Sequence, residues 1–433
     1  MSQKSFLLVV LLLTIISFSY FSQVNIQAFP SVPQSKILND NAPDISSAID
    51  PRVYGAKADG LTNDSAAIQR AIDYCAKNNG GIVILKNGNF LSSPLILKSG
   101  VYLKIDFPSQ LKAISYSEYP NNSDPQNFIV ADGASNIGIF GTGIVDGNGP
   151  DWWEKYKYTK GTASEQKRPR LIYLINCKDV VIAGITLQNS PSFHFVPNNC
   201  QNVIVINVRI KAPKTSPNTD GIDPSQCNTV FIDKCNISTG DDNIAIKAGK
   251  GPTNNIYITN CTFGDGHGLS IGSETNHGVD GLYVKDCTFE GTTNGIRVKS
   301  PRCYGGTVQN LSYTNIKMNN VDIAIEFSGY YPESKIPAPG TELEPLAGSG
   351  SPVFINNVTI DGLTATNVKK TAGYIVGVPE KPIKNLVLKD VSISSQRGLE
   401  VRNAQVITSN VAIEAEILPD YIIEENATVT PSQ

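Results

Sequence analysis

A short pattern of alternating apolar and polar positions recurs along most of the chain. Each copy is about six residues long, usually begins at Asn or Asp, and closes on an apolar residue or Cys. Clear copies are NIGIFGT from Asn136, DVVIAGI from Asp179, NVIVINV from Asn202, NIYITNC from Asn255 and NLVLKDV from Asn385. A period of two residues is typical of a half-buried β-strand. Strands this short bury their apolar face only by stacking on neighbours.

The spacing of the copies indicates how the strands are arranged. Their closing positions at Val208, Cys235, Cys261, Cys287 and Ile316 are separated by 27, 26, 26 and 29 residues. A repeat of this length indicates stacked coils, and the chain has neither the leucine-rich pattern nor a WD-type propeller signature. The sequence therefore predicts an all-β fold, a single-stranded right-handed parallel β-helix.

The segment before these copies has helical spacing. Between Asp64, which we expect to be the N-cap, and the stop at Gly80-Gly81, apolar residues recur at Ala67, Ile68, Ala71, Ile72 and Cys75. We predict a helix from Ser65 to Asn78. It would cover the open end of the coil, where strand edges would otherwise be unpaired.

The first residues have the layout of a secretory signal peptide. One Lys precedes an apolar run from Phe6 to about Phe21. The alternative, a membrane anchor, is disfavoured because the run is short and no basic cluster follows it. We expect a signal peptide at 1–23, a leader at 24–49, the β-helix domain at 50–418 and a C-terminal tail at 419–433, with a surface insertion from Ser334 to Pro352. Glycosylation sequons begin at Asn63, Asn121, Asn236, Asn260, Asn310, Asn357 and Asn426.

Charge and cysteine content exclude several classes. A net charge of −3 gives no overall attraction to nucleic acid or to an anionic membrane, so any anion site must be local. Of the eight Cys, Cys235, Cys261 and Cys287 occupy a slot that Val208 and Ile316 fill elsewhere. We expect these three to be buried thiols rather than bridges. No CxxC spacing occurs, and we expect no structural zinc and no other metal.

Four polar clusters follow one another at intervals of about one coil. They are NTDGID from Asn218, TGDDN from Thr239, GHG from Gly266 and RVK from Arg297. Because successive coils lie about 4.8 Å apart, the clusters should share one face. That face would bring together the carboxylates of Asp220, Asp241 and Asp242, the imidazole of His267, and the cations of Arg297 and Lys299.

Such a set suits hydrolysis of an anionic sugar polymer. One carboxylic acid must protonate the leaving oxygen while another carboxylate activates water or attacks directly. Crowding of like charges raises one pKa, so that one group keeps a proton while the others stay ionised. Each cluster alone is typical of a turn or a solvated surface. Their coincidence on consecutive coils is what favours a catalytic site.

At these residues the sequence resembles the polygalacturonases, pectin-hydrolysing glycoside hydrolases with a β-helix fold. The resemblance covers about Asp50 to Tyr331 and includes VYGAKADGLTNDSAAIQRAI, GTGIVDGNGPDWW and NSPSFHF. The strings STGDDNIAIKAG, GHGLSIGSET and GTTNGIRVKS are similar to those of bacterial-type endo-acting members. The resemblance implies inverting hydrolysis of α-1,4 bonds in polygalacturonic acid by an extracellular, cell-wall-directed monomer without a cofactor.

The resemblance also implies roles for individual residues. Asp241 would be the general acid, Asp220 and Asp242 would hold and deprotonate water, and His267 would tune the acid. Arg297 and Lys299 would bind the galacturonate carboxylate, for which an Arg fork is well suited, and Asn218 would contact substrate. A family tyrosine corresponds to Tyr330 or Tyr331, and we assign Tyr330. Val298 replaces the usual Ile, and Asn243 stands where many eukaryotic members have Cys.

Other functions remain open. An exo-acting enzyme, or a hydrolase of decorated pectin such as xylogalacturonan, would use the same chemistry with a differently closed groove. A pectate lyase would need a cation cluster and an Arg base and would release an unsaturated product. A non-catalytic carbohydrate-binding solenoid would not need Asp241.

Overall fold

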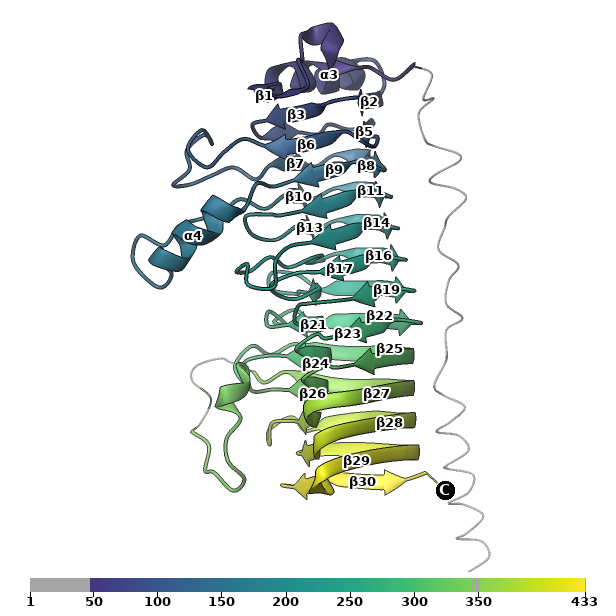
Figure 1. Cartoon of the computed structure of the whole chain (residues 1–433). Coiled ribbons are helices and arrows are strands. Elements are labelled where there is room, and N and C mark those ends of the chain that lie inside the picture. Colours follow the sequence, from purple (N-terminus) through teal and green to yellow (C-terminus); the bar gives the residue numbers. More distant parts are fainter. Residues whose placement is uncertain (1–46, 345, 347–350, 433) are drawn as a thin grey trace, which may run out of the picture. The chain divides into compact units, whose positions relative to one another are not determined.

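The computed structural model describes residues 47–344, 346 and 351–432, and these wind into stacked coils (Figure 1). Strand pairing between coils is parallel, with equivalent residues in register from one coil to the next. Along one face, Val180 pairs with Val203, Val203 with Val230, and Val230 with Ile256. The predicted right-handed parallel β-helix is confirmed. The described coils, up to Thr430, form one compact unit.

The strands lie on three faces, numbered here from 1 to 3. Face 1 holds β2 (Gly81–Leu85), β5 (Val101–Ile105), β8 (Ser135–Gly141), β11 (Lys178–Ala183), β14 (Gln201–Ile206), β16 (Asn228–Asp233), β19 (Thr253–Thr259) and β22 (Val279–Lys285). Face 2 holds β1 (Asp59–Asn63), β3 (Asn89–Ser92), β6 (Gln110–Ala113), β9 (Ile144–Asp146), β12 (Thr186–Gln188), β15 (Arg209–Lys211), β17 (Asn236–Ser238), β20 (Thr262–Phe263) and β23 (Thr288–Glu290).

Face 3 carries the polar clusters. It holds β4 (Leu95–Ile96), β7 (Ile129–Asp132), β10 (Ile172–Ile175), β13 (Phe195–Asn198), β18 (Ile244–Ile246), β21 (Leu269–Gly272), β24 (Asn294–Lys299) and β26 (Ile323–Ser328). The last coils are built from longer strands that run across faces, namely β25 (Thr307–Asn319), β27 (Phe354–Val376), β28 (Ile383–Arg402), β29 (Ala404–Glu424) and the short β30 (Thr428–Pro431).

The Asn that begins each copy has a structural reason. Asn202 and Asn255 have φ of 55° and 58°, in the left-handed region that Asn tolerates better than most residues. Their side-chain amides donate to the preceding coil, Asn202 to Asp179 at 2.9 Å and Asn255 to Asn228 at 3.1 Å. The Asn therefore makes the turn and ties two coils together.

Cysteines fill part of the core. Cys235, Cys261 and Cys287 are buried free thiols in the interior, as predicted. A second buried set, Cys177, Cys200 and Cys227, is also free, and Cys303 is exposed. The thiols therefore act as small apolar side chains between the sheets.

The predicted capping helix is α3 (Ser65–Lys77), preceded by the 3₁₀ turn η2 (Pro51–Tyr54). Its buried residues are those expected from the periodicity. Asp64 is the N-cap residue, as expected, but its side chain makes no hydrogen bond to the first turn of the helix. The Asp64 carboxylate instead accepts from the backbone N–H groups of Lys57 at 2.7 Å and Ala58 at 2.9 Å. Its strongest partners therefore come from the preceding loop, a contact that local sequence does not reveal.

Two of the excursions on the left of Figure 1 contain helical turns. One is α4 (Pro150–Thr159), which buries Trp152 and Trp153. The other is the insertion after β26, which contains the 3₁₀ turn η3 (Glu333–Lys335). It is anchored to the late coils because Arg402 donates to the Pro337 carbonyl at 2.8 Å.

The chain ends bear on the expected boundaries. The pairing of β28 with β29 extends to Arg402 and Glu424, so paired strand continues past the boundary expected at 418. The expected signal peptide, and the leader up to residue 46, lie outside the described residues. Among the residues the structure does describe, no helix has the length and apolar character required to cross a membrane.

Candidate active site

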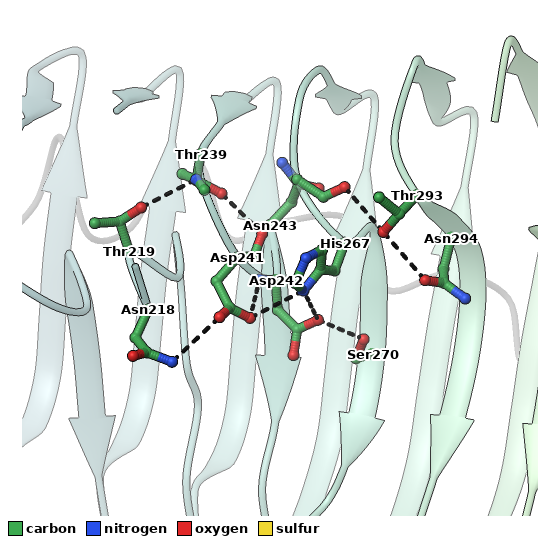
Figure 2. Close-up of polar contacts among 12 residues, drawn as sticks. Asn218, Thr219, Thr239, Asp241, Asp242, Asn243, His267, Ser270, Thr293 and Asn294 are labelled. Carbon is green, nitrogen blue, oxygen red and sulfur yellow. Dashed lines mark hydrogen bonds and ion pairs between the residues drawn. The ribbon is translucent and has the colours of Figure 1, made fainter. Parts of the chain in front are cut away.

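The four polar clusters meet on face 3, on consecutive coils. Ile222 pairs with Ile244, Ile244 with Leu269, and Leu269 with Ile296. Asp220, Asp242 and His267 each lie two residues before the paired residue of their own coil, in the turn that enters the face. The spacing in the sequence thus becomes a row of side chains along the coils (Figure 2).

Hydrogen bonds between coils and within them fix the turns that carry the row. The Thr219 hydroxyl accepts from the Gly240 N–H at 3.0 Å, and the Thr239 hydroxyl donates to the Asp241 carbonyl at 3.1 Å. Asn243 is fully buried, donates to the carbonyls of Ile237 and Asp265, and accepts from the Gly268 N–H. Asn243 therefore ties the turn of its own coil to the turn of the next coil without a covalent link.

The glycines that flank His267 serve the backbone. Glycine allows close approach either of a ligand or of another segment of backbone. A Cβ on Gly268, where φ is +75°, would lie 2.0 Å from the Asn294 carbonyl oxygen, and one on Gly266 would lie 2.7 Å from the Asp241 carbonyl oxygen. The close approach is therefore made by neighbouring coils, and it places the His267 ring against Asp241.

Asp241 is the most exposed of the three predicted carboxylates, with 22% of its side chain accessible. Its Oδ1 lies 3.1 Å from His267 Nδ1, and its Oδ2 accepts from the Asn218 amide at 3.3 Å. Burial alone would raise the pKa of Asp241, but the hydrogen bond and charge of His267, together with the hydrogen bond from the Asp242 N–H, hold that pKa below its usual value. In this state Asp241 favours its ionised form.

Asp242 is buried, with 2% of its side chain exposed, and both of its oxygens face cations. Arg297 donates to Oδ1 at 2.6 Å and Lys299 to Oδ2 at 2.6 Å, while Ser270 adds a hydrogen bond to Oδ1 at 3.0 Å. Burial would raise the pKa of Asp242, but Lys299 and Arg297 hold it far below its usual range. Asp242 is therefore an ionised carboxylate with fixed counter-charges.

Asp220 has the opposite electrostatic character. It is 3% exposed, and its Oδ1 accepts no hydrogen bond from the described residues. Burial, followed by the charges of Asp223 and Asp241, raises the pKa of Asp220 well above its ordinary value. The predicted separation of carboxyl pKa values is thus present, and the group whose pKa is raised most is Asp220.

His194 positions the backbone at Asp220. It is fully buried. Its backbone N–H donates to the Asp220 carbonyl at 2.8 Å, and its ring Nδ1 lies 3.1 Å from the same oxygen. Burial lowers the pKa of His194 to about 4, so the ring is neutral near neutral pH. His194 is therefore a structural support for the turn that carries Asp220.

The two tyrosines considered for the site point to different places. Tyr330 is 7% exposed and packs with Val376 and Val378 in a satellite apolar cluster. The ring of Tyr331 instead has the Lys299 Nζ 5.2 Å from its centroid. The structure therefore places Tyr331, and not the assigned Tyr330, beside the cations.

Comparison with known proteins places this site in a family. The model for glycosyl hydrolases family 28 matches residues 75–413. The chain is 36% identical over 378 residues to an endo-polygalacturonase of Pectobacterium carotovorum subsp. carotovorum, covering 81% of this chain and 89% of that protein. The chain belongs to glycosyl hydrolase family 28. The resemblance to polygalacturonases and the prediction of a glycoside hydrolase are confirmed.

Solved structures agree with this family 28 assignment. The polygalacturonase of Erwinia carotovora ssp. carotovora aligns with a TM-score of 0.69 at 31% identity, over 85% of this chain and 94% of that one. A hyperthermoactive exopolygalacturonase from Thermotoga maritima aligns with a TM-score of 0.71 at 25% identity, over 88% and 95%.

The family 28 site also includes a group with metal-ligand geometry. Ligand atoms of Asp241, Asp242 and His267 all lie within 4.8 Å of one another. Both oxygens of Asp242 are already paired with Arg297 and Lys299, so a cation would have to compete with two fixed positive charges. The surroundings favour an anion next to this group.

Reasoning from sequence missed several residues of the family 28 site. Asp223 and Lys247 lie beside the carboxylates, with Lys247 Nζ 3.5 Å from Asp223 Oδ2. Asp223 stands in the NTDGID string, where it read as part of a turn. Ser270 and His194 lie in the strings GHGLSIGSET and NSPSFHF but were given no roles, because these roles depend on which backbone and carboxylate atoms the coils bring to them.

Proposed function

We propose that this family 28 enzyme hydrolyses α-1,4 bonds of polygalacturonate within the chain and inverts the anomeric centre. One observation carries the proposal: Asp241 lies next to Asp242, and the Asp242 carboxylate is held between Arg297 and Lys299. A partly exposed acid group beside anchored cations suits a substrate that has a carboxylate on every sugar unit.

Exposure supports Asp241 as the general acid. A proton donor must reach the glycosidic oxygen, and Asp241 has 22% of its side chain accessible against 2% for Asp242. Its pKa is low in the free enzyme. A bound sugar would displace water from Asp241 and raise that pKa, so protonation would accompany substrate binding.

The remaining residues take supporting roles in the proposal. Asp242 and Asp220 hold the attacking water, and His267 and Asn218 keep Asp241 in position. Arg297 and Lys299 bind the substrate carboxylate, with Tyr331 in place of Tyr330 beside them. Because Asp242 shares the cations, a galacturonate carboxylate would join an existing ion-pair network.

We also propose that the protein is exported, acts on pectin outside the cell as a monomer, and is glycosylated at Asn236. The apolar run from Phe6 supports export. Asn236 is exposed, and its side-chain amide makes no hydrogen bond within the described residues. Asn260 and Asn310 instead donate their amide nitrogens to Asp233 and Asp280, at 2.7 and 2.5 Å.

Product analysis tests the proposed activity. Incubation with polygalacturonate should release oligomers of mixed length early, with reducing ends and no unsaturated sugar. Release of single units from the first minutes would favour exo action, and an unsaturated product would identify a lyase. No turnover of polygalacturonate alongside turnover of a xylose-decorated pectin would move the substrate to xylogalacturonan.

A further inference from the structure

One buried carboxylate near the site has no hydrogen bond. Asp223 is 1% exposed, and neither of its oxygens accepts a hydrogen bond from the described residues. Its recorded ionic contact is with Lys247 Nζ at 3.5 Å. An unsatisfied buried carboxylate costs free energy, so its position requires a reason other than stability.

Register places this pair in line with the substrate cations. Ile222 pairs with Ile244, and Ala245, Ser270 and Arg297 pair in succession, so Asp223 begins the row that leads to Arg297. Lys247 follows Ile244 by three residues, as Lys299 follows Ile296. Lys247 therefore occupies on its own coil the position that Lys299 occupies two coils later.

The position between the two lysines has no side chain. Gly272 pairs with Lys299, and a Cβ on Gly272 would lie 1.9 Å from the Lys299 carbonyl oxygen, so glycine is required there. Two coil spacings separate the lysine backbones by about 10 Å. Face 3 thus presents two lysines along the coil direction, with no side chain on the residue between them.

Lys247 can be both charged and reached. Burial alone would lower its pKa, but the charges of Asp223 and Asp220 raise it above its ordinary value. Its side chain keeps 19% exposure while its Nζ lies 5.1 Å from the centroid of the Phe193 ring. The Lys247 side chain is therefore partly exposed, and its ammonium group lies against the buried Asp223 carboxylate.

We propose that Lys247 binds the carboxylate of a second galacturonate unit, two coils before Lys299, and that Asp223 is its positioning residue. The proposal rests on the proposed function, since it concerns the same substrate. A polygalacturonate chain carries one carboxylate per unit, so a chain lying along face 3 can offer one to each lysine. At this second subsite, Lys247 would thereby favour unesterified pectin over esterified pectin.

Steady-state kinetics on polygalacturonate test the role of Lys247. Lys247→Met should raise KM about tenfold and change kcat less than about threefold, because the lost contact is to a unit that does not react. Its preference for unesterified over half-esterified pectin should weaken.

The matched control is Lys317→Met, which removes an exposed lysine of β25 and should leave KM unchanged. An unchanged KM in folded Lys247→Met overturns the subsite while the hydrolase activity stands. Lack of turnover by the parent contradicts the proposed function instead.

A double variant tests the role of Asp223 and guards against misfolding. Lys247→Met leaves the buried Asp223 without its counter-charge, which is strongly destabilising, whereas Asp223→Asn with Lys247→Met removes both charges. Asp223→Asn alone should raise KM, and it should add nothing once Lys247 is Met. Additive effects on KM would overturn the positioning role. If the double variant has the same KM as the parent, the proposed subsite is overturned.

Discussion

Lys299 donates to Asp242 at 2.6 Å from a strand two coils further along, so a cation expected to bind substrate is already paired with a carboxylate that we propose to be catalytic. Arg297 completes the pair at 2.6 Å on the other oxygen. Substrate affinity and the ionisation of Asp242 are therefore coupled through the same two side chains. Substitution of either cation should change both.

Lys299→Ala should raise KM and also move the acid limb of the kcat profile to higher pH. The pKa of Asp242 is low because Lys299 and Arg297 outweigh its burial, so loss of Lys299 raises that pKa. Below the new pKa Asp242 is protonated and cannot help to deprotonate water. Lys299→Arg, which keeps the charge, should retain the parent's acid limb. A pure KM effect in Lys299→Ala, with an unmoved profile, would contradict the coupling.

Asp241→Asn should abolish turnover while the fold persists. The amide cannot donate the catalytic proton, yet its oxygen can still accept from His267 as the carboxylate does at 3.1 Å. Loss of general acid catalysis typically lowers kcat by about 10²–10⁴. Melting temperature and kcat together check the result. A rate within tenfold of the parent would remove Asp241 from the role of acid.

Tyr331→Ala should weaken catalysis on polygalacturonate, and Tyr330→Phe should not. The Tyr331 ring lies near the Lys299 ammonium, and a cation over an aromatic face contributes about 0.5–1 kcal/mol at an exposed site. Tyr330 packs against Val376 and Val378, and phenylalanine preserves that contact. The measurement is kcat/KM for both variants. A larger loss in Tyr330→Phe would return the site role to Tyr330.

The repeat explains why so much of the fold follows from the sequence. Each coil is specified locally, by alternation in its strands and an Asn in its turn, and the same signal is repeated until the period is unmistakable. The apolar face of the capping helix is likewise recognisable from the spacing of Ala67, Ile68, Ala71 and Ile72. Spacing by about one coil then placed Asp220, Asp242, His267 and Arg297 together.

The features that could not be predicted depend on the direction in which a side chain points, which the spacing of residues along the sequence does not reveal. Tyr330 and Tyr331 are neighbours in the sequence, and only the path of the chain after β26 decides which ring reaches Lys299. Asp64 precedes a helix as a cap should, yet the loop at Lys57 takes its carboxylate. Asp223 resembled a turn residue because its burial comes from neighbouring coils.

Asp223→Asn should flatten the dependence of thermal stability on pH. Burial raises the pKa of Asp223 from 3.8 to about 7, with Asp242 and Asp241 adding to the rise and Lys247 opposing it. Between these values the folded protein holds a proton that the unfolded chain has released, so stability falls as pH rises through this window. The variant should lose less melting temperature from pH 4 to pH 7 than the parent does. Glu416→Gln, at an exposed position of β29, is the control and should follow the parent. Identical slopes in all three proteins would mean that Asp223 does not titrate in this window.

The stereochemical outcome should be inversion, and the contacts of Asp242 give the physical reason. In a retaining enzyme the second carboxylate attacks the sugar, with the two carboxyl groups about 5–5.5 Å apart, whereas an inverting pair leaves room for water. Asp242 is a poor nucleophile because Arg297 and Lys299 bind its two oxygens at 2.6 Å each and stabilise the anion. Asp220, one coil earlier, has an oxygen with no hydrogen-bond partner among the described residues, and this oxygen can accept from a water that Asp242 also holds. Proton NMR of the first reducing ends formed from α-linked polygalacturonate should therefore show the β-anomer, which later mutarotates. Early appearance of the α-anomer would mean that a carboxylate forms a covalent intermediate. Asp220 or Asp242 would then act as the nucleophile, and the two would not hold the attacking water.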